Sequence, residues 1–186
     1  MTTFAHVAPN KRKSTVRTSI ITMASAAFLV LSPAAFAQHR SQFGTADEAK
    51  AMLLKAVAAV NADKAKALDM FNKGEGGFLD RDLYPFCTNA SDGKFVALKN
   101  PNARQSLGQD IRTLKDSSGK TFGVAQFAAA QKPEGQLTEV SYLVPNSGAH
   151  TTPLPKVSFT TRAGDLVCGV GYYPMTTYWT FENPSG

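Results

Sequence analysis

The sequence has few of the residues and motifs on which enzymatic chemistry depends. It contains three histidines and two cysteines, and neither cysteine belongs to a C-x-x-C redox pair or a C-x-x-C-H haem-attachment motif. The G-x-S-x-G and H-E-x-x-H motifs of hydrolases and zinc proteases are also missing. Asp80 and Asp82 flank Arg81, which indicates a polar turn rather than an acid/base pair. We therefore expect no enzymatic activity, no cofactor and no metal site.

Long apolar segments are also scarce. The apolar run at residues 20–31 is shorter than the roughly 20 residues that a transmembrane helix requires. A basic stretch precedes it, and Ala35-Phe36-Ala37 follows with the small-x-small pattern of a cleavage site. These parts, in this order, predict a secretory signal peptide over residues 1–37, cleaved near Ala37. An uncleaved anchor helix is the alternative.

The net positive charge of the sequence, +6, is mostly due to this leader. The chain has 20 Lys and Arg against 14 Asp and Glu, and four of the basic residues but no acidic ones lie in residues 1–37. The rest therefore carries 16 basic against 14 acidic residues, a formal charge of +2, and these charges are interspersed. Nucleic acid is not an expected partner, and no membrane insertion is expected after cleavage. We expect residues 38–186 to form one periplasmic or secreted domain.

The first part of this domain predicts a long amphipathic helix. Thr45-Ala46-Asp47-Glu48 has the form of a capping box, which begins a helix. Apolar residues then recur every three or four positions over residues 49–71, and Gly74 ends the pattern. The helix is either continuous or divided into two nearly collinear helices at residues 61–63.

The later part predicts strands. Residues 83–89 and 94–98 form a hairpin through Ser91-Asp92-Gly93, and a short helix is expected at residues 121–131. Three further strands are expected at residues 136–144, 156–162 and 166–173.

Alternation in the strand at residues 156–162 separates two faces. Val157, Phe159 and Thr161 would lie toward the core, whereas the face that carries Lys156 would meet solvent or a ligand. Gly169 and Gly171 share a face of the last strand, which indicates close approach by another element.

A series of motifs follows these elements in order. They are F-C-T-N-A-S-D-G-K at 86–94, N-P-N at 100–102, G-Q-D-I at 108–111, L-K-D-S-S-G-K at 114–120, P-K-V-S-F at 155–159 and G-V-G-Y-Y at 169–173. Together they resemble the single Cache domain, a PAS-like extracytoplasmic sensor domain, over roughly residues 45–173. The resemblance implies an α+β fold in which a long N-terminal helix packs on a five-stranded antiparallel sheet. It also implies a ligand pocket between the sheet and the loop after its second strand.

The chain departs from that family in two respects. Lys99 stands where many members carry histidine. Cache domains usually lie between two membrane helices and feed a cytoplasmic signalling module, whereas this sequence ends at Gly186 with neither. We therefore expect a separate membrane receptor or sensor kinase as partner.

The family's sheet order also bears on the cysteines. Cys87 and Cys168 lie in the predicted first and last strands, which are central neighbours in a Cache sheet. Opposed residues of an antiparallel pair are close enough for a bridge, and an exported protein meets oxidising conditions. A Cys87–Cys168 disulfide is therefore favoured over two buried thiols.

The candidate ligand-binding residues are cations and tyrosines. Lys156 is favoured because Ser158 and Thr160 share its polar face, and a half-buried cation needs an anionic partner. Tyrosine supplies an apolar body with a polar tip. Ordinary solvated charges and core tyrosines are the alternatives. The predicted set is Tyr84, Lys99, Arg104, Tyr142 and Lys156, with Arg162 and Tyr172 as further candidates.

The sequence thus predicts an exported, soluble sensory domain that binds a small organic ligand, with a short carboxylate favoured, and presents it to a membrane partner. A non-catalytic structural protein that retains the fold without a functional pocket is the first alternative, and an exported hydrolase is the second. The aromatic tail at residues 174–186 is expected to dock on the domain or on a second subunit.

Overall fold

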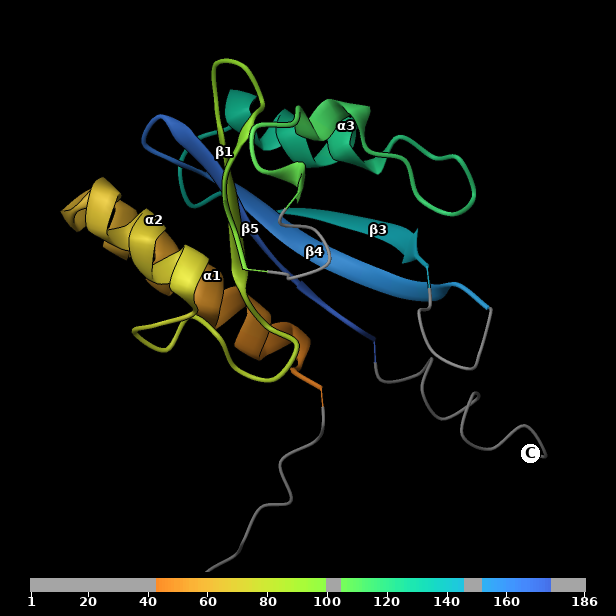
Figure 1. Ribbon diagram of the computed structural model, residues 1–186, viewed down its shortest axis with the longest axis horizontal. Coiled ribbons are helices and arrows are strands. Elements are labelled where there is room, and N and C mark those ends of the chain that lie inside the picture. Colours follow the sequence, from red (N-terminus) through yellow and green to blue (C-terminus); the bar gives the residue numbers. More distant parts are fainter. Residues whose placement is uncertain (1–42, 100–104, 146–151, 175–186) are drawn as a thin grey trace, which may run out of the picture. The chain divides into compact units, whose positions relative to one another are not determined.

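The computed structural model describes residues 43–99, 105–145 and 152–174 (Figure 1). The predicted signal peptide and cleavage site lie outside the described residues, as does the tail after Pro174. Within these ranges no helix has both the length and the apolar character needed to cross a membrane.

Two consecutive helices replace the single long helix. Helix α1 (Ala46–Ala62) begins at the predicted capping box, in which Glu48 N donates to Thr45 Oγ1 and Thr45 N donates to Glu48 Oε2. Asp63 ends α1 and caps α2 (Lys64–Lys73), because its extended backbone breaks the helix and its side chain accepts from Lys66 N. Gly74 ends α2 at φ 75°, a left-handed conformation that glycine adopts without strain. The two-helix alternative is therefore the correct one.

Five antiparallel strands form one sheet in the order β2-β1-β5-β4-β3, so the last strand lies at its centre (Figure 1). The predicted α+β class and five-stranded sheet are confirmed. The strands are β1 (Pro85–Asn89), β2 (Phe95–Leu98), β3 (Thr138–Val144), β4 (Leu154–Ala163) and β5 (Leu166–Tyr172). Between β2 and β3 lie a short 3-10 helix η2 (Ile111–Thr113), α3 (Phe122–Phe127) and a second 3-10 helix η3 (Ala128–Gln131).

Helices cover both faces of the sheet. Helix α1 packs on β4 and β5, where Leu53 and Ala56 share a core with Phe159 and Val170. Helix α3 and η3 contact β4 from the opposite side (Figure 1). Every residue of β4 from Lys156 to Thr161 is consequently buried. Of the two alternatives for the Lys156 face, bulk solvent is excluded at Lys156, Ser158 and Thr160, which are buried, whereas Arg162 at the end of the strand is exposed.

The two glycines of β5 make room for side chains from neighbouring strands. A Cβ atom at Gly169 would collide with the ring of Phe86 and lie 2.7 Å from Thr160 Cγ2. A Cβ atom at Gly171 would lie 2.7 Å from Lys156 Cε. The close approach predicted from the shared glycine face is confirmed, and the approaching groups are Phe86 and Lys156.

A disulfide joins Cys87 to Cys168 at the centre of the sheet. The two residues are direct partners in the β1–β5 register, and both are fully buried in the core beneath α1. The predicted pairing is confirmed.

We expect removal of this disulfide by the double substitution C87A/C168A to lower the free energy of unfolding by about 4 kcal/mol. The bridge closes 81 residues of sequence, which restricts the unfolded chain. Urea unfolding of the variant and the wild type measures the difference. Reduction of the wild type is the control and should give a similar loss. Two alkylatable thiols in unreduced protein would contradict the assignment.

Candidate ligand-binding site

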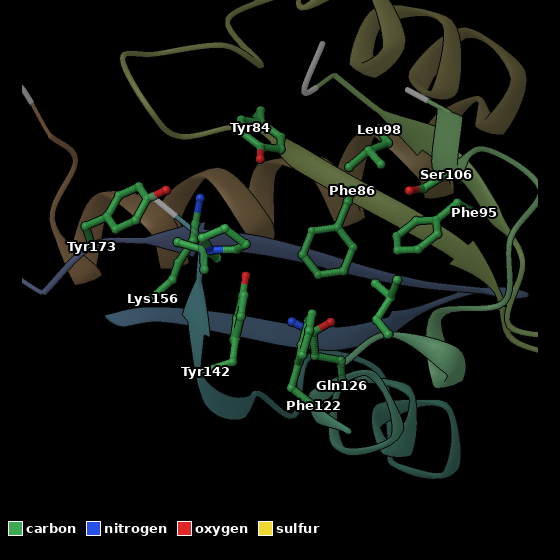
Figure 2. Close-up of a pocket in the computed structure, with 13 residues that line it drawn as sticks. Tyr84, Phe86, Phe95, Leu98, Ser106, Phe122, Gln126, Tyr142, Lys156 and Tyr173 are labelled. Atoms are coloured by element: carbon green, nitrogen blue, oxygen red, sulfur yellow. The ribbon is translucent and has the colours of Figure 1, made fainter. Parts of the chain in front are cut away.

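A cavity of about 580 Å³ lies between the sheet and the segment that follows β2 (Figure 2). Its wall is built by residues of β1, β2, β3, β4 and α3 together with the connecting loops. The lining residues are Tyr84, Phe86, Phe95, Leu98, Ser106, Leu114, Phe122, Gln126, Tyr142, Val144, Pro145, Lys156 and Tyr173.

Lys156 supplies a positive charge at one end of the cavity. It is 7% exposed, and its Nζ lies 4.4 Å from the ring centre of Tyr173 and 5.4 Å from that of Tyr84. None of the ion pairs formed within the described part of the chain includes Lys156. Aromatic faces attract the ammonium group, but they compensate only part of the loss of water.

The environment of Lys156 disfavours its charged form. Burial lowers the pKa of Lys156 from 10.5 to about 8, and Asp82 opposes this shift without reversing it. The amino group is therefore mostly protonated at neutral pH. An anion in the cavity would stabilise the charge that the fold leaves poorly compensated.

Tyr142 lies opposite Lys156 in the β3–β4 register and lines the same end of the cavity. Its ring stacks on Phe122 with centroids 4.2 Å apart and an interplanar angle of 3°. Burial raises the pKa of its phenol, and Tyr84 and Tyr173 raise it further, so the hydroxyl keeps its proton and remains a donor. Figure 2 shows the hydroxyls of Tyr84, Tyr142 and Tyr173 gathered around the Lys156 amine.

The opposite end of the cavity is mostly apolar, and Ser106 is a polar side chain there (Figure 2). Phe86, Phe95 and Leu98 form its wall, and the rings of Phe86 and Phe95 meet edge to face at 6.2 Å (Figure 2). Leu114 packs against the same cluster from the segment after η2. Gln126 lies alongside, where its Nε2 donates to Ser158 Oγ at 2.6 Å.

Three of the five predicted binding residues meet at this cavity: Tyr84, Tyr142 and Lys156. Lys99 lines an adjoining hollow of about 350 Å³, and its Nζ donates to the Lys73 carbonyl at 2.7 Å. Arg104 lies outside the described residues.

The two further candidates lie elsewhere. The Arg162 guanidinium donates to the Gly164 carbonyl and lines a separate hollow beside Asp165. Tyr172 stacks on Phe159 in the core beneath α1. Residue alternation places Tyr172 on the opposite face of β5 from Gly169 and Gly171, so it points away from the cavity.

Ten of the 13 lining residues were not predicted from the sequence, and Tyr173, Phe122 and Gln126 are three of them. A signal for Tyr173 was present, because residues 169, 171 and 173 share one face by alternation, and that face carries the two glycines. Phe122 and Gln126 carried no comparable signal, since both lie in the short helix α3, whose packing depends on distant strands.

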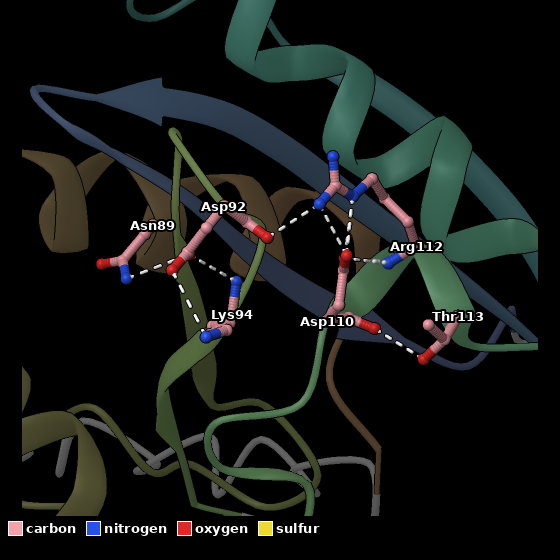
Figure 3. Close-up of polar contacts among 6 residues, drawn as sticks. All are labelled: Asn89, Asp92, Lys94, Asp110, Arg112 and Thr113. Atoms are coloured by element: carbon pink, nitrogen blue, oxygen red, sulfur yellow. Dashed lines mark hydrogen bonds and ion pairs between the residues drawn. The ribbon is translucent and has the colours of Figure 1, made fainter.

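A group of polar contacts holds the segment that leads into the cavity wall against the β1–β2 turn (Figure 3). We call the contacts of Asp110, Arg112 and the Asp92 carbonyl the latch. The Arg112 side chain binds both carboxylate oxygens of Asp110, and its Nη2 donates to the Asp92 carbonyl at 2.9 Å. Ile111 N donates to the Gly93 carbonyl at 2.9 Å. The Arg112 side chain holds the pKa of the Asp110 carboxyl below its usual range, so the latch is charged at neutral pH.

Asp116 joins the next turn to the end of β3. Its carboxylate accepts hydrogen bonds from Ser118 N, Lys120 N and Leu143 N. Ser118, through its side chain, contributes most to lowering the pKa of Asp116 to about 2, and the backbone donors add to the effect. This turn thus ties the loop after η2 to the strand that carries Tyr142. No cluster of three or more His, Cys, Asp or Glu suited to a metal ion occurs in the described ranges.

We expect Asp110→Asn to loosen the latch, because the Arg112 guanidinium loses its charged partner. Hydrogen exchange at the Ile111 amide should become faster in the variant. Asp69→Asn is the matched control, since it breaks an exposed Asp69–Lys73 pair on α2 and leaves the Ile111 amide untouched. Equal exchange rates at Ile111 in all three proteins would contradict the role of the latch.

We expect Lys156→Met to make the ligand-free protein more stable at pH 7 by about 1–3 kcal/mol, because the buried charge is removed. The folded-state pKa of about 8 lies below the usual 10.5, so the unfolded chain binds more protons between these values. Wild-type stability should therefore rise with pH from about 8 to about 10.5, and the variant should lack this rise. Urea unfolding at pH 7 and pH 9.5 tests both statements, and a destabilised variant at pH 7 would contradict them.

Comparisons with known proteins bear on the fold. No protein-family model and no curated protein matches the sequence. Among solved structures, the chain is similar to a methyl-accepting chemotaxis protein from Vibrio parahaemolyticus RIMD 2210633, with a TM-score of 0.52 and 21% identity over 70% of this chain and 89% of that one.

Two further solved structures align with lower TM-scores. One is a periplasmic sensor domain of a chemotaxis protein, with a TM-score of 0.49 and 22% identity over 68% of this chain and 88% of that one. The other, reported for carboxylic acid recognition by a Cache chemosensory domain, has a TM-score of 0.46 and 21% identity over 67% of this chain and 85% of that one. The chain therefore shares its fold with a chemotaxis protein, and the predicted α+β fold with a five-stranded antiparallel sheet agrees with this likeness.

Proposed function

We propose that this protein is an exported sensor domain that binds a small organic carboxylate in the cavity, with Lys156 as the cation that holds it. The observation that carries the proposal is a nearly buried lysine that lines the cavity and has no ion-pair partner among the described residues. A buried ammonium group is stabilised most by an oppositely charged group at hydrogen-bond distance. A ligand carboxylate meets that need without a change in the fold.

The hydroxyls around Lys156 suit the same ligand. Tyr142 keeps its proton at neutral pH, so it is a donor for a carboxylate oxygen beside the lysine. Tyr84 and Tyr173 complete the polar end. Lys99 is not proposed as a direct contact because its amino group already binds the Lys73 carbonyl, whereas the role of Arg104 stays a prediction.

A sensory role is supported by the shared fold with a methyl-accepting chemotaxis protein. We propose that a separate membrane receptor or sensor kinase detects the bound form in the periplasm or outside the cell. Export through the leader at residues 1–37 is part of this proposal. The alternative of a structural protein without a functional pocket is disfavoured by the cavity of about 580 Å³.

A thermal-shift titration with a panel of monocarboxylates tests the binding step. We expect stabilisation of the wild type at pH 6.5, little or none for Lys156→Met, and wild-type behaviour for Lys66→Met. Lys66 is an exposed lysine of α2 and serves as the matched control. At ligand concentrations of about 100 times the dissociation constant, mass action predicts about 2.7 kcal/mol of stabilisation.

The pH dependence of binding provides a second measurement. The cation is present below the pKa of about 8, so affinity should fall as the pH rises through and above that value. Calorimetric titration at pH 6.5 and pH 9.5 measures the change. Equal affinities of wild type and Lys156→Met for every acid, at both pH values, would disprove the role of Lys156.

A further inference from the structure

The cavity is divided into a cationic end and an aromatic end. Lys156 and the tyrosines form the first, and Phe86, Phe95 and Leu98 line the second together with Ser106 (Figure 2). Leu114, a further lining residue, packs against the same apolar cluster. We infer that the ligand is a monocarboxylate with a sizeable apolar body, such as an aryl or branched alkyl group, rather than a very short acid, a dicarboxylate or an amino acid. This inference rests on the proposed function and specifies its ligand.

The size of the cavity favours an apolar body. A volume of about 580 Å³ falls within the roughly 300–1,000 Å³ typical of small-molecule sites. An acid of two or three carbons at Lys156 would leave the Phe86 and Phe95 walls in contact with water. Each additional buried methylene contributes about 0.8 kcal/mol, so affinity should increase with the apolar body until the aromatic end is filled.

The shape of the wall favours planar groups. The Phe122 and Tyr142 rings stack with an interplanar angle of 3°, and Phe86 and Phe95 present ring edges and faces across from them. Aromatic ligands pack against such surfaces by stacked or edge-to-face contacts.

The charges of the lining select a single carboxylate. Of the 13 residues that line the cavity, Lys156 is the one that carries a formal charge at neutral pH. No aspartate or glutamate is among them, so a ligand ammonium group would be buried without a carboxylate partner. A second ligand carboxylate at the aromatic end would likewise meet no cation among the lining residues.

Asp82 does not line the cavity, but it lines the adjoining hollow, which shares Tyr84, Lys156 and Tyr173 with the cavity. Its Oδ1 accepts a hydrogen bond from Gly44 N at 2.6 Å, whereas its buried Oδ2 has no hydrogen-bond partner in the described part of the chain. Its effect on the cavity is the opposing influence on Lys156 described above.

Calorimetric titration of the purified chain with five probes tests the inference. The probes are acetate, hexanoate, phenylacetate, phenylacetamide and phenylalanine. We expect phenylacetate and hexanoate to bind at least about tenfold more tightly than acetate. Phenylacetamide, which lacks the charge, and phenylalanine, which adds an ammonium group, should each bind at least about tenfold more weakly than phenylacetate.

A pair of leucine variants locates the apolar body. Leu114→Phe places a larger side chain in the wall and should weaken phenylacetate at least about tenfold while changing acetate less than about twofold. Leu107→Phe is the matched control, because Leu107 is 42% exposed and is not a lining residue. It should bind both acids as the wild type does.

The outcomes separate this inference from the proposed function. Acetate that binds as tightly as phenylacetate, or phenylalanine that binds as tightly as phenylacetate, would overturn the ligand class and leave carboxylate binding at Lys156 intact. Failure of every carboxylate to bind would overturn both. Equal effects of Leu114→Phe on acetate and phenylacetate would overturn the placement of the apolar body at the aromatic end.

Discussion

The pairing of β5 between β1 and β4 is the constraint on which the rest of this structure depends. In sequence β5 follows every other strand and helix of the described residues, yet it lies at the centre of the sheet and pairs with β1 and β4. Cys87 and Cys168 lie opposite each other in this pairing and bond covalently. The same register places Phe86 over Gly169. One interaction therefore both closes the core and shapes the cavity.

The two faces of the sheet have different tasks. The face beneath α1 contains a dense apolar core around Phe71, Phe159 and the disulfide, and it supplies most of the stabilising burial. On the opposite face, Gly169 and Gly171 contribute no side chains and leave room for Phe86 and Lys156. Burial on this face lowers the pKa of the Lys156 amino group. A buried, incompletely compensated charge lowers stability, and the stable core on the other face offsets that loss.

The cavity wall is assembled from segments that are held by different polar contacts. The Asp110–Arg112 latch binds the segment after β2 to the β1–β2 turn, and Asp116 binds the following turn to β3. Both carboxylates have lowered pKa values, so both contacts are charged at neutral pH. These contacts hold the segments around Asp110 and Asp116 against the sheet, which suits a binding site with a preformed shape.

Local sequence patterns determined the elements of this protein, and tertiary packing determined the site. The capping box at Thr45 and the alternation of β4 depend on neighbours a few residues apart, and the sequence predicted them correctly. The break at Asp63 was one of two alternatives that the local pattern left open. The resemblance carried by the motifs also implied that the first and last strands are neighbours, and hence favoured the bridge between Cys87 and Cys168. By contrast, strand register and helix packing determine which side chains line the cavity. Tyr173 lines it, whereas Tyr172 packs in the core and Lys99 lines an adjoining hollow. Phe122 and Gln126 line it because α3 packs beside the sheet. A side chain's direction changes with a shift of one residue in a strand, and only the assembled sheet defines which direction faces the cavity.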